Sequence, residues 1–586
     1  MRSTIAAKVI LEKLGVQSIR EMSVEEFKEQ SSQPLGNLFS SEFGASTLIA
    51  PFSCLEFISS FDAASNSREL RLPKTIKRVF LHSMESSQNC EQLLRNLLGD
   101  SKARLIPMNS RNVDFTYSRE ETNICGPLTG LTIRSNEEIA CWGFVLQSGS
   151  TDKVHPLIES NSESVLIRLR AKDLDLFMLF TSHLGDPNTP VEVNLDIRAC
   201  LFSYAAPVMV LKYLSRGIGW TARNNYANLI IDDVPLSLRY GCIDFRKICD
   251  QAAKRHVSMT LAYIPLNYRR GSDECIRFFK KRSDAISFCI HGCNHTGSEF
   301  GGTDAGRIST LASLASYRMK LFSERTGLPH TKIMVFPQGI FSAQAFGVLK
   351  THNFNAAINT ELRNVAGENC VAFKDMLEPA ITSYHSFPLF LRRKVSDGLG
   401  NVAFDLLLDK PCLIVTHHDD FCSDAGEVWQ LIDAINALPN PPEWRSIEDL
   451  VARTVISRNV GTNLIELKVY SGNVDLVNLI NVHGGSYLHV VKSENHPETI
   501  SNILVGQREA EWHIEEGRII VMVGKHLEGS RLSVHYRQDQ LLDPQRLRLS
   551  EMIVAYCRGR LCELRDNLAA KAPAMHMAMR FVKKFL

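Results

Sequence analysis

The sequence of 586 residues has no large excess of charge of one sign and no long apolar segment. Lysine and arginine number 66, against 64 aspartate and glutamate residues. This balance argues against a dedicated nucleic-acid-binding protein, which normally has a strong basic excess. The stretch Ala199 to Leu211 is apolar but has only 13 residues, whereas a membrane-spanning helix needs about 20. We therefore expect neither a membrane-spanning helix nor a nucleic-acid partner.

The 15 cysteines are scattered along the chain, and no CxxC pair occurs. An odd number cannot all pair, and scattered cysteines suit a reducing compartment, where they act as small apolar side chains. The first residues, Met1 to Glu12, include Lys8 and lack the apolar core of a secretory signal. These features predict a cytoplasmic location.

Hydrophobic residues make up 44% and charged residues 22% of the chain, as in globular proteins, and the length predicts three or four domains. Residues 1–205 predict an α/β domain without a phosphate-binding loop, a nucleophile elbow or metal-ligand spacing. Residues 206–455 alternate strand and helix, which predicts parallel strands in a barrel or a doubly wound sheet, with a less certain strand near 380–383. Residues 456–545 predict a small antiparallel β-sandwich, and residues 546–586 predict two basic helices.

The positive charge is concentrated at the end of the chain. Residues 546–586 contain nine basic and three acidic residues, a net charge of +6, so the total of +2 leaves −4 for the rest. The segment from Met575 to Leu586 combines Met, Phe, Val and Leu with three cations. Such a helix can lie on an anionic membrane surface or pack its apolar side on the protein itself, and the sequence leaves both open. The first alternative predicts peripheral contact with the inner face of the membrane.

Polar side chains follow three of the strands predicted in residues 206–455. The βα loops of a parallel barrel converge at the carboxyl ends of its strands, so we expect these side chains at one site. Adjacent carboxylates after an apolar strand are costly unless their charge is used. Histidines four residues apart can share a cation such as zinc, and a histidine in a late loop can protonate a leaving amine. These residues are Asp232 and Asp233 after 227–231, His291 and His295 after 285–290, and His417 and His418 after 412–416.

Each of these motifs taken alone also fits a helix cap, a turn or a polar loop. Their order along the chain is Asp-Asp, His-Gly-x-x-His, a Pro-x-Gly turn at 337–339 and a late strand that ends in histidine. This order resembles the polysaccharide deacetylase family, carbohydrate esterase family 4, in the branch whose first motif reads Ile-Asp-Asp. The resemblance covers residues 222–455. It implies an α/β fold with a distorted (β/α)7 barrel of polysaccharide deacetylase type, here between an N-terminal α/β domain and a C-terminal β-sandwich.

The resemblance further implies a divalent metal, commonly zinc, and removal of N-acetyl groups from amino sugars. Family members usually have an arginine that positions the base two residues before the proline of the turn, where this chain has Val335. Arg392 and Arg393 are candidates to replace it. The implied roles are metal ligation by Asp233, His291 and His295, base catalysis by Asp232, and acid catalysis by His417 or His418.

The predicted function is therefore metal-dependent deacetylation of an N-acetylated sugar in glycoconjugate or surface-polysaccharide synthesis, with lipid-linked and nucleotide-linked sugars among the candidate substrates. Two alternatives stay open. The same fold can hydrolyse the C–N bond of a non-sugar amide, because fold alone does not fix function. The chain can also be a non-catalytic sugar-binding or scaffold protein, which the missing arginine at Val335 would favour.

Overall fold

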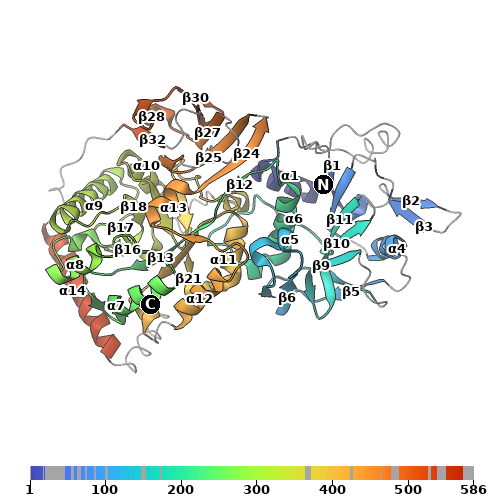
Figure 1. Ribbon diagram of the computed structural model, residues 1–586, viewed down its shortest axis with the longest axis horizontal. Helices are drawn as coiled ribbons and strands as arrows, with labels where there is room; N and C mark the ends of the chain where they lie inside the picture. The colour runs from blue at the N-terminus through green and yellow to red at the C-terminus, as the bar shows by residue number, and fades with distance from the viewer. Residues whose placement is uncertain are drawn as a thin grey trace.

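The computed structural model places a mixed sheet, a barrel of parallel strands and two smaller sheets side by side (Figure 1). No helix of the described residues is long and apolar enough to cross a membrane. The structure describes residues 2–17, 19, 46–54, 59–62, 67–70, 72, 76–84, 87–98, 103–146, 153–171, 174–362, 371–422, 426–461, 463–476, 487–524, 530–537 and 549–571.

The N-terminal part mixes strands and helices around one large sheet. Its elements are α1 (Arg2–Lys13), β1 (Ser46–Pro51), β2 (Ser59–Asp62), β3 (Ser67–Leu70), β4 (Ile76–His82), α4 (Ser87–Leu98), β5 (Arg104–Met108), β6 (Val113–Tyr117), α5 (Thr122–Cys125), β7 (Thr132–Ser135), β8 (Cys141–Val145), β9 (Val154–Ser160), β10 (Glu163–Ala171), β11 (Leu174–Leu179) and α6 (Ala206–Leu214). The sheet runs β1-β4-β11-β10-β9-β6-β7, and β8 links β5 to β10. Its hydrophobic core extends toward the barrel, because Phe404 and Leu407 belong to the same cluster.

The second part is a nearly closed sheet of parallel strands surrounded by helices. Its elements are β13 (Tyr226–Asp232), β14 (Arg239–Tyr240), β15 (Ile243–Asp244), α7 (Phe245–Lys254), β16 (Met259–Tyr263), α8 (Asp273–Lys280), β17 (Ile286–His291), α9 (Ala305–Thr326), β18 (Ile333–Val335), α10 (Ala343–Thr351), β19 (Ala356–Asn359), β20 (Leu389–Leu391), β21 (Arg393–Lys394), α11 (Gly398–Leu407), β22 (Cys412–Thr416), η9 (His418–Phe421), α12 (Gly426–Asn436), β23 (Glu443–Trp444) and α13 (Ile447–Arg453). The strand order is β20-β19-β18-β17-β16-β13-β22-β21, and β23 pairs with the start of β13.

A single stretch of chain joins the two edges of this sheet. β20 pairs in parallel with β19, and β21 pairs in parallel with β22. Only Arg392 separates β20 from β21, so the barrel closes at this residue. The strand predicted near 380–383 was wrong, since that segment contributes only an isolated bridge from Ile381 to Leu389. The apolar run that follows Pro388 provides the strand instead.

Side chains on the strands of the barrel alternate between two apolar environments. Leu229 and Ile231 of β13 pack in the large cluster that includes the surrounding helices. Ile230 belongs to a different cluster, to which the other parallel strands also contribute. Because side chains two residues apart point to the same face of a strand, Asp232 lies on the face of Ile230, toward the interior of the barrel.

The residues after the barrel form two further sheets that share one hydrophobic cluster. The elements are β24 (Val455–Gly461), β25 (Leu464–Val469), β26 (Asn473–Asp475), β27 (Tyr487–Ser493), β28 (Ile500–Val505), β29 (Arg508–Glu509), β30 (Trp512–Glu515), β31 (Arg518–Val523) and β32 (Arg531–Tyr536), and β12 (Thr221–Ala222) joins from before the barrel. One sheet runs β12-β24-β25-β27-β31-β30 and the other β26-β32-β28-β29. β25 and β27 pair in parallel, unlike the antiparallel pairing predicted, because the chain between them passes through β26 of the other sheet.

The last described helix, α14 (Leu549–Lys571), lies against the barrel at the end of the molecule away from the N-terminal sheet (Figure 1). This helix confirms the one predicted over 549–570, whereas the helix predicted over 574–586 lies outside the described residues. Tyr240 in β14 donates a 2.6 Å hydrogen bond to Asp566. Arg270 forms an ion pair with Glu563 at 2.6 Å. The end of the chain therefore returns to the loops of the barrel.

Candidate metal centre and active site

The two adjacent carboxylates at the end of β13 have different surroundings. Asp232 is the last residue of the strand and is 2% exposed. Asp233 has a φ of 64°, in the left-handed region that few residues other than glycine adopt. This turn separates the two side chains: Asp232 contacts Arg392, and Asp233 faces His291 and His295.

Asp233, His291 and His295 bring three potential ligand atoms together. Oδ1 of Asp233 lies 3.1 Å from Nε2 of His291 and 2.9 Å from Nε2 of His295. One ligand atom from each residue lies within 4.8 Å of the other two, and the imidazole centroids are 4.9 Å apart. The sequence predicted these three residues as one cluster, and the structure brings them together.

The orientation of His291 leaves one ring nitrogen available for a cation. Its Nδ1 lies 3.0 Å from the carbonyl oxygen of Val335, so the Nδ1 proton can be donated there. Nε2 then carries a lone pair toward Asp233. Metal-ligating histidines are commonly held by this kind of hydrogen bond from the other nitrogen. Val335 therefore contributes to the site through its backbone.

Glu299 fixes the turn between the two histidines, and the sequence analysis did not identify it. Its carboxylate accepts backbone hydrogen bonds from Cys293 at 2.7 Å, Asn294 at 3.0 Å and His295 at 3.2 Å. Gly292, with a φ of 62°, makes room for this carboxylate, because a Cβ there would lie 2.1 Å from Oε1 of Glu299. The short spacing between the histidines thus depends on a glycine and a buried carboxylate.

The donor set of the cluster fits a divalent cation. Oδ1 of Asp233 is buried and makes no hydrogen bond within the described part of the chain. Burial opposes ionisation of Asp233, but the facing His295 and His291 outweigh it and hold its pKa well below the ordinary value. A carboxylate and two imidazole nitrogens are typical ligands of zinc, and three protein ligands leave a position for substrate or water.

Asp232 forms a buried ion pair with Arg392. Nη1 and Nη2 of Arg392 donate to the two carboxylate oxygens at 2.9 and 2.6 Å, and Nε donates to Thr360 at 3.0 Å. The guanidinium is 4% exposed. Burial alone would raise the pKa of Asp232, but the charge of Arg392 outweighs it, with smaller contributions from His291 and His417, and the pKa falls below its ordinary value. Asp232 is therefore an anion at neutral pH.

Of the two candidate arginines, the structure places only Arg392 at the site. Arg393 points away and pairs with Asp405 at 2.6 and 2.8 Å. The position that has an arginine in the resembling family, Val335, is on β18 of the same barrel, and only β19 lies between β18 and β20. Arg392, the residue at which the barrel closes, thus brings a guanidinium to the carboxylate of Asp232.

The two adjacent histidines after β22 have different partners. Nε2 of His417 lies 3.8 Å from Oδ2 of Asp232, and the side chain is 47% exposed. His418 is buried and turns toward α14, with Nε2 3.4 Å from Oδ1 of Asp566. Only His417 can present a proton to a molecule beside Asp232.

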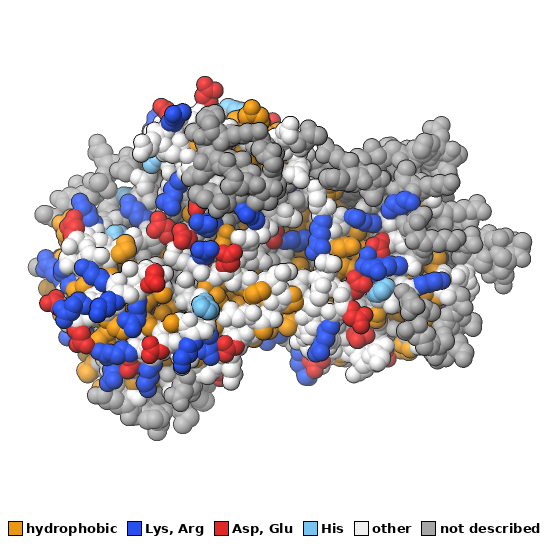
Figure 2. Space-filling view, viewed as in Figure 1, with side chains coloured by type: hydrophobic (Ala, Val, Ile, Leu, Met, Phe, Trp, Pro, Cys, Tyr) orange, Lys and Arg blue, Asp and Glu red, His pale blue; other side chains and the backbone are white. Residues whose placement is uncertain are grey.

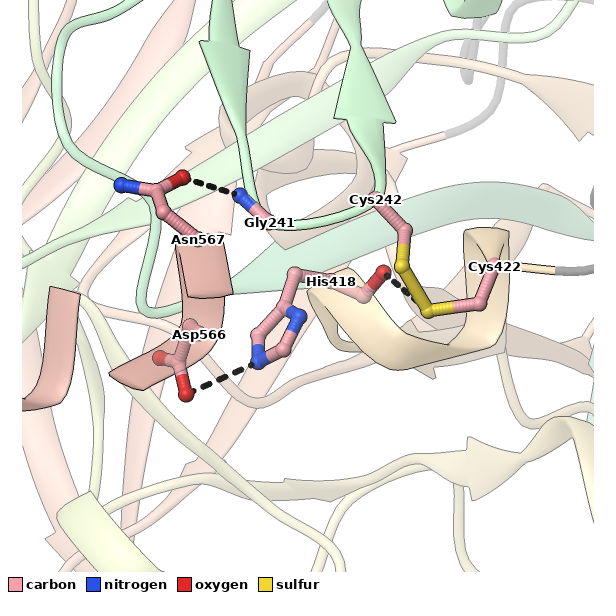
Figure 3. Close-up of a disulfide and its surroundings, with 6 residues drawn as sticks. All are labelled: Gly241, Cys242, His418, Cys422, Asp566 and Asn567. Carbon is pink, nitrogen blue, oxygen red and sulfur yellow. Dashed lines mark hydrogen bonds and ion pairs between the residues drawn. A yellow bond between two sulfur atoms is a disulfide. The ribbon is translucent and has the colours of Figure 1, made fainter. Parts of the chain in front are cut away.

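A disulfide joins two of the loops around the site (Figure 3). Cys242, between β14 and β15, pairs with Cys422 at the end of η9. Beside it, Gly241 donates its backbone N–H to Asn567 of α14 at 2.9 Å. Gly241 has a φ of 54°, and a Cβ there would lie 2.5 Å from Nδ1 of His418. The disulfide, His418 and α14 thus hold the loop that presents His417.

A cavity of about 270 Å³ opens beside the cluster, slightly smaller than the range of about 300–1,000 Å³ that is typical of ligand sites. Asp233 and His295 are among the residues that line it. Gln338 of the Pro-x-Gly turn also lines it, with a φ of 59°. Nine of its 19 lining residues belong to α14. This contribution could not be predicted from the sequence, because α14 lies more than 250 residues from His295 along the chain.

Comparisons with known proteins do not identify an activity. No protein-family model and no curated protein matches the chain. The chain is similar to the crystal structure of Agd3, described as a novel carbohydrate deacetylase, with 9% identity, a TM-score of 0.48 and coverage of 91% of this chain and 97% of that one. It is also similar to a T48 deacetylase with substrate, with 15% identity, a TM-score of 0.22 and coverage of 36% and 83%. A family 4 carbohydrate esterase from Streptomyces lividans in complex with acetate has 9% identity, a TM-score of 0.22 and coverage of 37% and 88%.

These identities and TM-scores are too low to assign an activity, so a function has to be argued from the side chains at the site.

Proposed function

We propose that the protein is a metal-dependent hydrolase that removes an acetyl group from the nitrogen of an amino sugar. One observation supports this function above all others. A three-residue ligand cluster lies directly beside an ionised carboxylate, Asp232. The half-exposed side chain of His417 lies next to this carboxylate. Metal-assisted hydrolysis of an amide uses these parts: a cation, a base for water and an acid for the leaving nitrogen.

Asp233, His291 and His295 would hold the metal. When bound, a divalent cation there supplies the positive charge that makes water acidic and polarises an amide carbonyl. Two imidazoles and one carboxylate favour zinc over magnesium or calcium, which prefer oxygen ligands only.

Asp232 accepts the proton of the attacking water. Its interior position beside Asp233 and its bidentate contact with Arg392 keep it ionised and fixed in orientation. His417 then donates a proton to the departing nitrogen. Its Nε2 lies 3.8 Å from Asp232 and its side chain is half exposed, so it can reach a substrate on the open side of the carboxylate.

The substrate class rests on the resemblance of the motifs to the polysaccharide deacetylase family. The volume of the cavity suits a single sugar unit with its acetyl group better than a bulky ligand. Lipid-linked and nucleotide-linked N-acetylated sugars are the substrates to compare first, and acetylated non-sugar amides provide the contrast.

Metal binding and turnover are expected to disappear together when one ligand is removed. The wild-type protein should bind about one zinc per chain and release acetate from one or more members of a panel of N-acetylated sugars. His291→Ala should lose both, because two remaining ligands hold the ion weakly. Inductively coupled plasma mass spectrometry measures the metal, and a coupled acetate assay measures turnover.

His513→Ala, on β30 in the small sheets, is the matched control and should keep both properties. If the wild-type protein binds no divalent ion, or His291→Ala keeps full metal content, the proposed function is wrong. If metal binds but only non-sugar amides are cleaved, the substrate assignment is wrong, whereas metal-dependent hydrolysis of an amide is supported.

The two neighbouring histidines are expected to give different results. His417→Gln should lower kcat by about 10²-fold or more without changing metal content, because the leaving nitrogen then lacks its acid. His418→Gln should keep kcat within a few-fold and lower Tm, because it removes the contact with Asp566 of α14. Equal losses of kcat in the two variants would argue against His417 as the acid.

A further inference from the structure

The outer face of α14 is exposed and apolar. Of the 13 large apolar side chains that are exposed among the described residues, six belong to this one helix. Five of them form what we call the apolar stripe, and their exposed fractions range from 48% to 66%. Isolated exposed apolar residues are normal, but a contiguous group usually marks an interaction site. The stripe consists of Ile553, Val554, Leu561, Leu564 and Leu568.

The stripe is continuous along the helix. At about 100° per residue, its five side chains span an arc of about 100° on one side. Cys557, which is also exposed, lies within the same arc. The opposite side of the helix, with Ala555, Asp566 and Ala569, is buried. α14 therefore has one side that packs on the barrel and a second apolar side without a partner in the described part of the chain.

Positive charge lies on both borders of the stripe. Arg558 and Arg565 follow it on one side, and Arg560 lies on the other. Glu563 pairs with Arg270 and also with Arg560, and Asp566 contacts Tyr240 and also Arg565, so Arg558 is the border arginine for which no acidic partner is described in α14. Figure 2 shows Lys and Arg side chains gathered over α7, α8 and α14 at this end of the molecule. An apolar stripe with arginines on its borders is complementary to a lipid membrane, whose interior is apolar and whose headgroups can be anionic.

We propose that α14 docks on an anionic lipid membrane through the apolar stripe. A second copy of the chain is disfavoured, because two such helices would bring arginines of like charge together along both borders. The sequence that follows α14 continues the same chemistry, since residues 572–586 contain three cations, several large apolar residues and no acidic residue. This proposal does not depend on the proposed catalytic activity.

The docked orientation has a consequence for the cavity. Arg558, Arg560 and Arg565 both border the stripe and line the cavity. A membrane that contacts the stripe therefore lies next to arginines that line the same cavity as Asp233 and His295.

Vesicle flotation tests the proposal with the full-length protein. The probes are phosphatidylcholine vesicles with and without about 30% phosphatidylglycerol, each at about 0.1 M and 0.5 M salt. We expect flotation with the anionic vesicles at low salt, and weaker flotation at high salt or with phosphatidylcholine alone. The triple variant Leu561→Gln, Leu564→Gln, Leu568→Gln should lower the partition coefficient more than about tenfold.

A triple variant on the small sheets is the matched control. Tyr487→Gln, Ile514→Gln and Met522→Gln remove side chains that are 54%, 38% and 52% exposed, and this variant should float like the wild type. Arg558→Gln, which keeps the stripe intact, should weaken only the binding to anionic vesicles. Circular dichroism of each variant verifies that α14 and the rest of the protein are folded.

The proposal is overturned if the wild-type protein does not float, or if the leucine variant floats equally well. It is also overturned if flotation does not depend on phosphatidylglycerol. Sedimentation velocity provides the competing result: a dimer that the leucine variant dissociates would identify a second copy as the partner of the stripe.

Discussion

Asp232→Asn is expected to lower kcat by about 10²–10⁴-fold while metal content stays at the wild-type level. Asn has nearly the same shape and can still contact Arg392, but it cannot accept a proton from water. The ligands Asp233, His291 and His295 are unchanged, so the ion is retained. Steady-state acetate release and metal analysis on the same preparation separate these two properties.

Asp405→Asn is the matched control for this variant. Asp405 is a buried carboxylate with a bidentate arginine partner, Arg393, but it lies away from the ligand cluster. Its replacement should reduce stability and leave kcat of the folded protein unchanged. If Asp232→Asn keeps wild-type turnover, another group is the base and the assignment fails.

Arg392→Met is expected to lower the free energy of unfolding by about 3–5 kcal/mol. Removal of one partner of a buried ion pair leaves the other charge uncompensated in the interior. Asp232 is 2% exposed and would be that charge. Urea unfolding, with the slope of the transition compared between variants, measures the loss.

Two further variants distinguish the stability effect from the catalytic one. Arg393→Met breaks an equally buried pair and should cost a similar free energy, but the protein that remains folded should keep its kcat. In the double variant Asp232→Asn, Arg392→Met no buried anion is left unpaired, so part of the lost stability should return. If the double variant is less stable than the sum of the single effects, the pair does not act as described.

The sequence was sufficient to predict the barrel strands that carry the candidate site. β22 lies where it was predicted, and β13 and β17 differ only by terminal residues. Fully buried parallel strands read as short apolar runs, which are recognisable without an alignment. The carboxyl ends of such strands meet at one rim, so the convergence of Asp233, His291 and His295 followed from their positions.

The closing segment of the barrel could not be predicted in the same way. The strand near 380–383 and the run Leu389–Leu391 are both short and apolar, and only tertiary pairing decides between them. The choice of Arg392 over Arg393 depends on which side of the chain faces the barrel interior. That alternation cannot be assigned until the register with β19 is known.

Contacts between distant segments also lay beyond the sequence analysis. Cys242 and Cys422 are separated by 180 residues, and scattered cysteines give no indication of which pair is adjacent. A disulfide is unusual in a reducing compartment, so the cytoplasmic location stays a prediction. The packing of α14 on the barrel could not be predicted either, because its contacts, such as Tyr240 with Asp566, join residues 326 positions apart.

The closure of the barrel at Arg392 also determines when the site can form as the chain folds. β20 needs β19 as its partner, and β21 needs β22, which ends at Thr416. During synthesis, residues 389–394 therefore leave the ribosome before one of their partners exists. Pairings between distant segments are the slow part of folding. We therefore expect Asp232 to gain its arginine in the same late step that closes the barrel, after the strands that position Asp233, His291 and His295 have been synthesised.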